Sequence, residues 1–354
     1  MRSILITGGC GFVGSNLAIY LKVTYPANQI ICLDNLKRRG SELNLKRLKA
    51  AGIQFIHGDI RNKEDFEELG KIDFLIEAAA EPSVLAGLDN TPDYLINTNL
   101  LGTINCLNFA LKQNAGFIFL STSRVYPYAR LDQVNFEEEQ SRFVLSSHQT
   151  IRGISENGIT TDFPSEGARS LYGATKLSSE LLITEYCELL GMNAVINRCG
   201  VITGPWQMGK VDQGVIVLWM ARHYWKKDLT YTGYGGTGKQ VRDILHVHDL
   251  FRLLDWQMNN MQAVNGKVFN VGGGVPCSVS LKELTAICEK LTGNKINIAP
   301  VKENRKADLR IYLTDNSAVT VATGWSPAYT PEKIMEEIFD WIKNNETELK
   351  PILD

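Results

Sequence analysis

The sequence lacks any close pairing of its cysteines. Seven Cys are present and none forms a Cys-x-x-Cys pair. They are scattered through the chain as Cys10, Cys32, Cys106, Cys187, Cys199, Cys277 and Cys288. This spacing excludes a short disulfide framework and a zinc ribbon and favours reduced thiols. No metal site is expected, since His246 and His248 have no ligand-like partners and are interpreted as structural.

The chain also lacks an excess of charge of either sign. Lys and Arg number 37 and Asp and Glu 39, which gives a net charge of −2. A balance so close to zero excludes a polybasic arm and any general attraction to anionic surfaces. We therefore expect neither nucleic acid nor a membrane as a partner.

Long hydrophobic runs are absent as well. No apolar stretch approaches the ~18 residues that a membrane span needs. The sequence enters a strand-like run at Ser3 without a signal-peptide pattern. With 354 residues, 44% of them hydrophobic and 21% charged, the chain can bury a large core. We expect a cytoplasmic protein of two or three domains.

Short β-branched runs alternate with amphipathic runs over the first 200 residues. The expected strands are nearly continuous apolar runs, at Ser3–Thr7, Gln29–Asp34, Ile53–Gly58, Phe74–Ala79, Gly116–Thr122 and Asn193–Arg198. Such runs are typical of a parallel sheet that is buried on both faces. The alternation predicts an α/β fold with a Rossmann-type doubly wound sheet.

The last third of the sequence predicts a smaller α/β lobe. Ser280 and Glu283 form a capping box that opens a helix, and Thr330 caps another helix with Pro331 at its first position. Residues 1–198, with 240–274 returning to them, are predicted to form the first domain. Residues 199–239 and 275–354 then form the smaller lobe.

In one segment, from about residue 127 to 169, the apolar residues follow no clear helical or strand period. Its length is far above the usual ~4–6 residues of a connection. It is interpreted as a loop that covers the substrate or contacts another subunit, with a plain surface excursion as the alternative.

A glycine-rich turn follows the first strand and opens the first helix. Gly8, Gly11 and Gly14 give the spacing G-x-x-G-x-x-G, and Phe12 and Val13 lie between the last two. Backbone N–H groups of such a turn, with the helix N-terminus, bind a pyrophosphate. All five residues are expected to contact a dinucleotide, although a glycine-rich turn without function remains the alternative.

Asp34 ends the second strand, 20 residues after Gly14. A carboxylate there accepts hydrogen bonds from the adenosine ribose of NAD and repels the 2′-phosphate of NADP. NAD is therefore the expected cofactor, despite the basic residues 37–39. Further contacts are expected at the ends of neighbouring strands, from Asn35, Asp59, Ile60, Ala78 and Ala79. For Asp59 the alternative is a turn or cap residue.

Tyr172 and Lys176 stand four residues apart, which places both on one face of a helix. A neighbouring Lys⁺ and the positive nicotinamide are expected to lower the pKa of the phenol. The phenolate then removes a hydroxyl proton while NAD accepts the hydride. Thr122, at the end of the fifth strand, is expected to bind the reacting oxygen, with a plain strand residue as the alternative.

These motifs together resemble the extended short-chain dehydrogenase/reductases, the nucleotide-sugar epimerases and dehydratases. The resemblance also includes His57-Gly58-Asp59, Asn99-x-x-Gly102-Thr103 and Arg242-Asp243-Ile244-Leu245-His246. It implies that Thr122, Tyr172 and Lys176 are catalytic, and that Asn99 supports the active site and the cofactor.

Ser123 and Arg124 follow Thr122, where the 4,6-dehydratases carry an Asp-Glu pair, so dehydration is not expected. The motifs Asp212-Gln213-Gly214 and Gly238–Asp243 are similar to those of the CDP-tyvelose (CDP-paratose) 2-epimerases. Substrate contacts are expected from Ser83, Thr122, Cys199, Gln213, Arg242 and Arg305. The two arginines suit a diphosphate, with structural ion pairs as the alternative.

The resemblance implies an NAD-dependent epimerase that inverts a carbon of a nucleotide-diphosphate sugar, namely C2 of CDP-paratose or CDP-tyvelose, through a transient ketone. The alternatives are a UDP-sugar 4-epimerase and a non-catalytic NAD-binding sensor. Relatives pair two long helices from each subunit, so a homodimer or homotetramer is expected.

Overall fold

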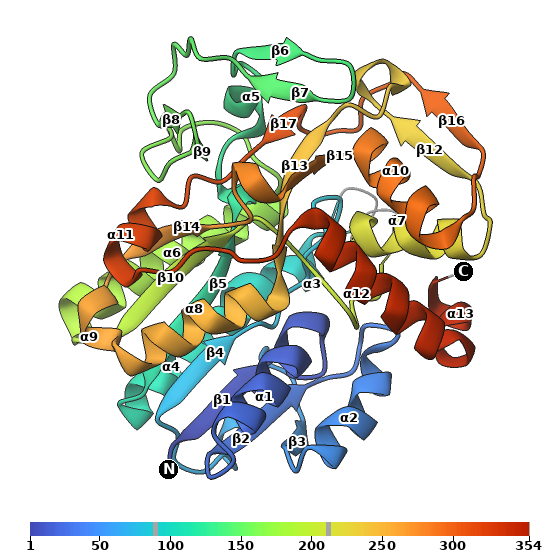
Figure 1. The fold of residues 1–354 in the computed structure, drawn as a ribbon. Coiled ribbons are helices and arrows are strands. Elements are labelled where there is room, and N and C mark those ends of the chain that lie inside the picture. Colours follow the sequence, from blue (N-terminus) through green and yellow to red (C-terminus); the bar gives the residue numbers. More distant parts are fainter. Residues whose placement is uncertain (88–90, 210–213, 354) are drawn as a thin grey trace.

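A seven-stranded parallel sheet forms the centre of the protein (Figure 1). The computed structural model describes residues 1–87, 91–209 and 214–353. In spatial order the strands are β14 (Val268–Val271), β10 (Ala194–Cys199), β5 (Gly116–Thr122), β4 (Phe74–Glu77), β1 (Ser3–Thr7), β2 (Gln29–Asp34) and β3 (Gln54–His57). The predicted doubly wound sheet is confirmed. Its strand order reverses between β1 and β4, and ligands of such sheets bind where the strand order reverses, beyond the carboxyl ends of the strands.

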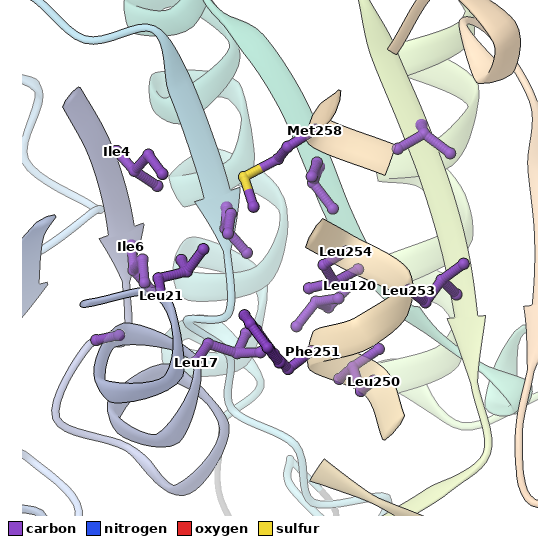
Figure 2. Close-up of a cluster of buried hydrophobic side chains, with 14 of the residues drawn as sticks. Ile4, Ile6, Leu17, Leu21, Leu120, Leu250, Phe251, Leu253, Leu254 and Met258 are labelled. Atoms are coloured by element: carbon purple, nitrogen blue, oxygen red, sulfur yellow. The ribbon is translucent and has the colours of Figure 1, made fainter. Parts of the chain in front are cut away.

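Helices cover both faces of this sheet, because alternate residues of each strand point to opposite sides. Figure 2 shows Ile4 and Ile6 of β1 on the face that carries α1 (Phe12–Thr24) and α8 (Val247–Asn259). Leu5 lies in the cluster on the other face, with residues of α4 (Gly102–Gln113) and α6 (Leu171–Leu190). Both clusters are almost fully buried.

Shorter helices also pack on this part of the chain, and the last of them comes from residues 275–354, which were expected to form the smaller lobe. They are α2 (Asn44–Ala50), α3 (Asp93–Ile96), α9 (Met261–Val264) and α11 (Ser317–Thr323). A π-helical turn, Asn97–Leu101, joins α3 to α4.

The smaller lobe has its own sheets and its own core. One sheet holds β11 (Val201–Thr203), β13 (Val241–His246), β15 (Ser278–Ser280) and β17 (Ile311–Tyr312), and β12 (Leu229–Thr232) pairs with β16 (Ile298–Val301). Its helices are α7 (Val215–Tyr224), α10 (Leu281–Thr292), α12 (Pro331–Asn344) and α13 (Glu346–Leu353). The Ser280–Glu283 capping box is present, and the Thr330 hydroxyl accepts a hydrogen bond from the Lys333 N–H (3.3 Å).

The segment 240–274, expected to return to the first domain, is divided between the two lobes. β14 and α8 do join the large sheet and its helix layer. β13 does not: it pairs in parallel with β11 and antiparallel with β15 in the small sheet. The chain thus crosses back into the first domain only after His246.

The long segment after β5 folds as α5 (Tyr128–Leu131) and two small hairpins. These are β6 (Phe136–Glu138) with β7 (Phe143–Leu145), and β8 (Ile154–Ser155) with β9 (Gly158–Ile159). The hairpins lie beside β17 and β13 at the top of Figure 1. The Phe143 N–H donates to the Lys239 carbonyl (3.0 Å) and the Ile159 N–H to the Leu313 carbonyl (2.8 Å). The segment is therefore fastened to the smaller lobe.

Among the helices of the described residues, none combines the length and the apolar character that crossing a bilayer requires.

Candidate active site

The glycine-rich turn is packed so closely that side chains have no room. A Cβ on Gly14 would lie 2.2 Å from the Gly8 carbonyl oxygen, and one on Gly8 would lie 2.7 Å from the Ala79 nitrogen. Gly8 also has a φ of +67°, which favours glycine. The turn thus brings bare backbone against the end of β4, and α1 begins directly after it at Phe12, with Val13 packed on the core.

A cavity of about 360 Å³ lies at this edge of the sheet. Eight of the predicted cofactor contacts line it, namely Gly8, Gly11, Asp34, Asn35, Asp59, Ile60, Ala78 and Ala79. The others, Phe12, Val13, Gly14, Asn99, Tyr172 and Lys176, are not among its lining residues. A helix N-terminus, bare backbone and a carboxylate in one hollow fit a dinucleotide.

Asp34 is held by the backbone on both sides. Its Oδ2 accepts a hydrogen bond from the Cys10 N–H (2.9 Å) and its Oδ1 one from the Leu36 N–H (2.8 Å). Burial raises the pKa of Asp34, and these N–H groups act in the opposite direction. A carboxylate has about four acceptor positions, so two remain for ribose hydroxyls.

Asp59 is engaged by neighbouring side chains. It accepts from the Asn35 amide (2.8 Å) and forms an ion pair with Arg61 (2.6 Å). Burial acts to raise the pKa of Asp59, but the hydrogen bonds from Arg61 and Asn35 outweigh it and lower the pKa to about 2. Its Oδ1 also accepts from the Arg61 N–H (3.0 Å), as in the turn alternative.

The fold brings Thr122, Tyr172 and Lys176 together. Thr122 is the last residue of β5, and α6 starts at Leu171 after an N-cap in which the Ser170 hydroxyl accepts from the Gly173 N–H (3.2 Å). The Thr122 hydroxyl lies close enough to the Tyr172 phenol to lower its pKa. Lys176 lies one turn further along α6 and is only 1% exposed.

Burial has the largest effect on the pKa of the phenol. Burial raises the pKa of Tyr172 to about 12, while the Thr122 hydroxyl and the charge of Arg124 lower it. Lys176 is not among the groups that lower it. That Lys176 lowers the pKa of the phenol stays a prediction. Lys176 is itself buried and interacts with another charged partner.

That partner is Glu77, a fully buried carboxylate at the end of β4. Burial lowers the pKa of Lys176, and the charge of Glu77 acts against this. The Lys176 Nζ also lies 4.3 Å from the centroid of the Phe119 ring. Glu77 Oε1 accepts from the Thr103 hydroxyl (2.6 Å), and burial raises the pKa of Glu77 to about 6. Sequence reasoning missed Glu77, although an acid inside an apolar strand was a visible signal.

Asn99 supports the site from the π-helical turn. Its side chain accepts from the Glu81 N–H (2.8 Å) and donates to the Glu81 carbonyl (3.0 Å). It also approaches the Thr175 hydroxyl on α6 (3.4 Å). Asn99 thus ties the chain that follows β4 to the helix that carries Tyr172.

A second cavity, of about 470 Å³, is lined by residues of both lobes, among them Arg124, Arg242 and Arg305. Arg242 forms an ion pair with Asp308 (3.0 Å), as in the structural alternative, and still lines the cavity. Arg124 was not predicted as a site residue. Its position two residues after Thr122 was the signal in the sequence that could have indicated it. Neither lining, over the described part of the chain, includes Thr122, Tyr172 or Lys176.

Two of the remaining predicted substrate residues, Cys199 and Ser83, are buried. Cys199 ends β10 and is 3% exposed; burial raises the pKa of its thiol to about 12. It is close enough to Tyr172 for a charge on the thiol to influence the phenol. Ser83 is 7% exposed, and its hydroxyl accepts from the Leu85 N–H (3.2 Å). Gln213 lies outside the described residues.

Comparison with known proteins agrees with this geometry. Residues 4–272 match the model of the NAD dependent epimerase/dehydratase family. The chain is 32% identical to a CDP-paratose 2-epimerase of Salmonella typhi over 349 residues, covering 96% of this chain and 98% of that protein.

Two solved structures share the fold. One is a dTDP-glucose 4,6-dehydratase of Bacillus anthracis in complex with NAD, with a TM-score of 0.79, 25% identity and coverage of 99% and 100%. The other is a UDP-glucose 4-epimerase of Thermotoga maritima with UDP-glucose, with a TM-score of 0.76, 24% identity and coverage of 97% and 99%. The resemblance drawn from the motifs is confirmed. The chain belongs to the NAD dependent epimerase/dehydratase family, within the extended short-chain dehydrogenase/reductases, and its cofactor is NAD.

Proposed function

We propose that this enzyme is an epimerase of nucleotide-diphosphate sugars and that it inverts C2 of CDP-paratose or CDP-tyvelose. The observation that carries the proposal is the contact between the Thr122 hydroxyl and the Tyr172 phenol at the carboxyl end of the cofactor sheet. The 32% identity to a CDP-paratose 2-epimerase supports the choice of nucleotide, sugar and carbon.

Bound NAD supplies the acceptor for a hydride from the sugar carbon and later returns that hydride. The protein handles the proton. Tyr172, as phenolate, removes the proton of the sugar hydroxyl, and Thr122 binds the same oxygen. When the sugar has turned and the hydride returns to its opposite face, Tyr172 gives the proton back, so atoms and electrons balance over the cycle.

The residues after Thr122 support epimerisation over dehydration. Expelling water from the sugar requires a general acid near the reacting carbons. Ser123 and Arg124 occupy the position where dehydratases carry their acid pair. Arg124 cannot donate a proton near neutral pH because a guanidinium stays charged there.

The test is conversion followed by proton NMR. The purified protein is incubated with CDP-paratose, and separately with UDP-glucose, and the C2 and C4 proton signals are followed. We expect inversion at C2 of the CDP-sugar and no inversion of the UDP-sugar. Inversion of UDP-glucose at C4 alone would show a 4-epimerase and overturn the proposed substrate.

Tyr172→Phe separates an enzyme from a cofactor-binding sensor. The variant keeps the ring and loses the proton acceptor, so we expect turnover to fall by about 10²–10⁴-fold. NAD content, measured by absorbance after denaturation, should stay near that of the unsubstituted protein. Unchanged turnover in Tyr172→Phe would contradict the assigned role.

We also propose that the protein is a homodimer formed through α4 and α6. Three leucines near the C-terminal half of α6 are unusually exposed: Leu181 (64%), Leu189 (75%) and Leu190 (53%). Leu101, in the turn that leads into α4, is 48% exposed. A group of exposed apolar side chains on neighbouring helices is typical of a subunit interface.

A further inference from the structure

Arg124 joins the catalytic residues to the arginine-lined cavity. It lies in the short 3-10 helix Ser123–Val125, directly after β5, and its backbone N–H donates to the Thr122 hydroxyl (3.2 Å). Its carbonyl lies against α6 so closely that a Cβ on Gly173 would be 2.1 Å away. Arg124 therefore touches the residue next to Tyr172 through its backbone, while its side chain lines the 470 Å³ cavity.

The side chain is fixed but not neutralised. Its Nη1 donates to the Ala307 carbonyl (2.9 Å). Among the ion pairs of the described residues, none includes Arg124, whereas Arg242 is paired with Asp308. Burial and the charge of Arg242 lower the pKa of Arg124 to about 10, while the charge of Asp308 acts against them, and Arg124 remains a cation at neutral pH. A partly desolvated cation beside a second arginine is a strong site for an anion.

We propose that Arg124 binds the sugar-side phosphate of the diphosphate and thereby presents C2, rather than C4, to Tyr172. This inference rests on the proposed function. It differs from the sequence-based assignment, in which Arg242 and Arg305 were the only phosphate ligands.

The connectivity of a nucleotide sugar explains the selection. The sugar-side phosphate is attached through one oxygen to the anomeric carbon, C1. C2 is bonded to C1, whereas C4 lies across the ring. A cation close to Tyr172 that binds this phosphate therefore brings the C2 hydroxyl towards the phenol and keeps C4 away. A phosphate bound only at the far end of the cavity would leave room for C4.

The first experiment compares binding of CMP and CDP by calorimetry, with NAD-loaded protein. CDP has the second phosphate and CMP does not. We expect Arg124→Met to weaken CDP binding about 10- to 100-fold, as for other charge-assisted hydrogen bonds, and to leave CMP binding nearly unchanged. Arg124→Lys should be intermediate, since it keeps the charge without the planar fork.

The controls address folding and location. Arg130→Met changes an exposed arginine on α5 and should alter neither affinity. Thermal unfolding of each variant establishes that it is folded. Equal losses of CMP and CDP affinity in Arg124→Met, or no loss of either, would overturn the phosphate contact.

The second experiment measures kcat and KM for C2 inversion of CDP-paratose. Misplacing a reacting group by about 1 Å costs about 10²-fold in rate, so Arg124→Met should lose roughly that in kcat at saturating substrate. An unchanged kcat would show that Arg124 does not select C2. If the unsubstituted protein inverts no CDP-sugar at C2, the proposed function fails, whereas the CMP and CDP comparison still tests the phosphate contact.

Discussion

Among the groups that raise the pKa of Lys176, Glu77 has the largest effect, ahead of Cys199, Cys106 and Glu180. Glu77 raises the pKa of the lysine, and burial of the lysine lowers it. Both side chains are almost completely buried, so solvent screens this interaction little. Glu77 is therefore the main neighbour that favours the charged form of Lys176 against burial.

Glu77→Gln should shift the pH profile of turnover. The amide oxygen can still accept the Thr103 hydrogen bond, but the charge that keeps Lys176 protonated is lost. The pKa of Lys176 then falls, and its ammonium deprotonates at a lower pH. We expect the alkaline limb of the kcat profile to move to lower pH. The profile is measured between pH 6 and 10 at constant ionic strength, so that screening is the same at every pH. Glu64→Gln, at an exposed site, should leave the profile in place.

Gly14 is needed for the shape of the cofactor turn. In Gly14→Ala the new methyl group would meet the Gly8 carbonyl at 2.2 Å, and overpacking of this kind costs about 1–3 kcal/mol. We expect reduced NAD content after purification and a lower melting temperature. Gly70→Ala is the matched control, because no atom lies within 4 Å of its new Cβ. Equal NAD content in both variants would contradict the role of the turn.

Helix α6 positions two of the three side chains that are predicted to be catalytic. Its first turn is capped by Ser170, and its middle is held by a buried ion pair between Glu180 and Arg198 of β10 (2.7 Å). Ser121 of β5 also hydrogen-bonds Glu180. These contacts hold the helix against strands β5 and β10.

Ser170→Ala should weaken both the fold and the reaction. Loss of an N-cap costs about 1 kcal/mol, and here the freed turn contains Tyr172. We expect a lower melting temperature together with a reduced kcat. Thr330→Ala removes a similar cap from α12, whose first turn carries no site residue, and should lower the melting temperature alone. A kcat reduced equally in both variants would argue against local positioning by Ser170.

In the molecule as a whole, two lobes meet at the arginine-lined cavity. Residues of α7, β12 and β13 line it from the smaller lobe, and Arg124, two residues after the end of β5, lines it from the larger one. The hairpins of residues 127–169 are fastened to the smaller lobe, and the exposed leucines of α6 lie on the larger one. The proposed substrate site and the proposed subunit contact therefore lie on different surfaces.

Leu181→Glu should weaken the proposed dimer. A charge in the middle of an apolar interface carries a desolvation cost of several kcal/mol in dissociation free energy. We expect the mass measured by light scattering after size exclusion to shift from dimer towards monomer. Val321→Glu, at an even more exposed apolar residue of α11 (88%), should not change the mass. A monomeric unsubstituted protein would refute the proposal directly.

The sequence by itself determined the parts that depend on local pattern. Continuous apolar runs located six of the seven strands of the large sheet to within one or two residues at their ends, and the caps at Ser280 and Thr330 marked the starts of their helices. The glycine spacing and Asp34 indicated the cofactor turn, because the spacing of a turn is a local property of the chain. The motifs around Thr122, Tyr172 and Lys176 were sufficient to indicate the family.

Only the tertiary structure decided which groups act on one another across elements. Glu77 and Lys176 are 99 positions apart in the chain and interact through burial, which no spacing rule describes. Arg124 approaches Tyr172 because the backbone after β5 packs against Gly173. Arg242 forms its ion pair with Asp308 because the fold brings these distant residues together. β13 belongs to the small sheet because it pairs with β11. Charge, burial and strand pairing all depend on neighbours that the folded chain brings together.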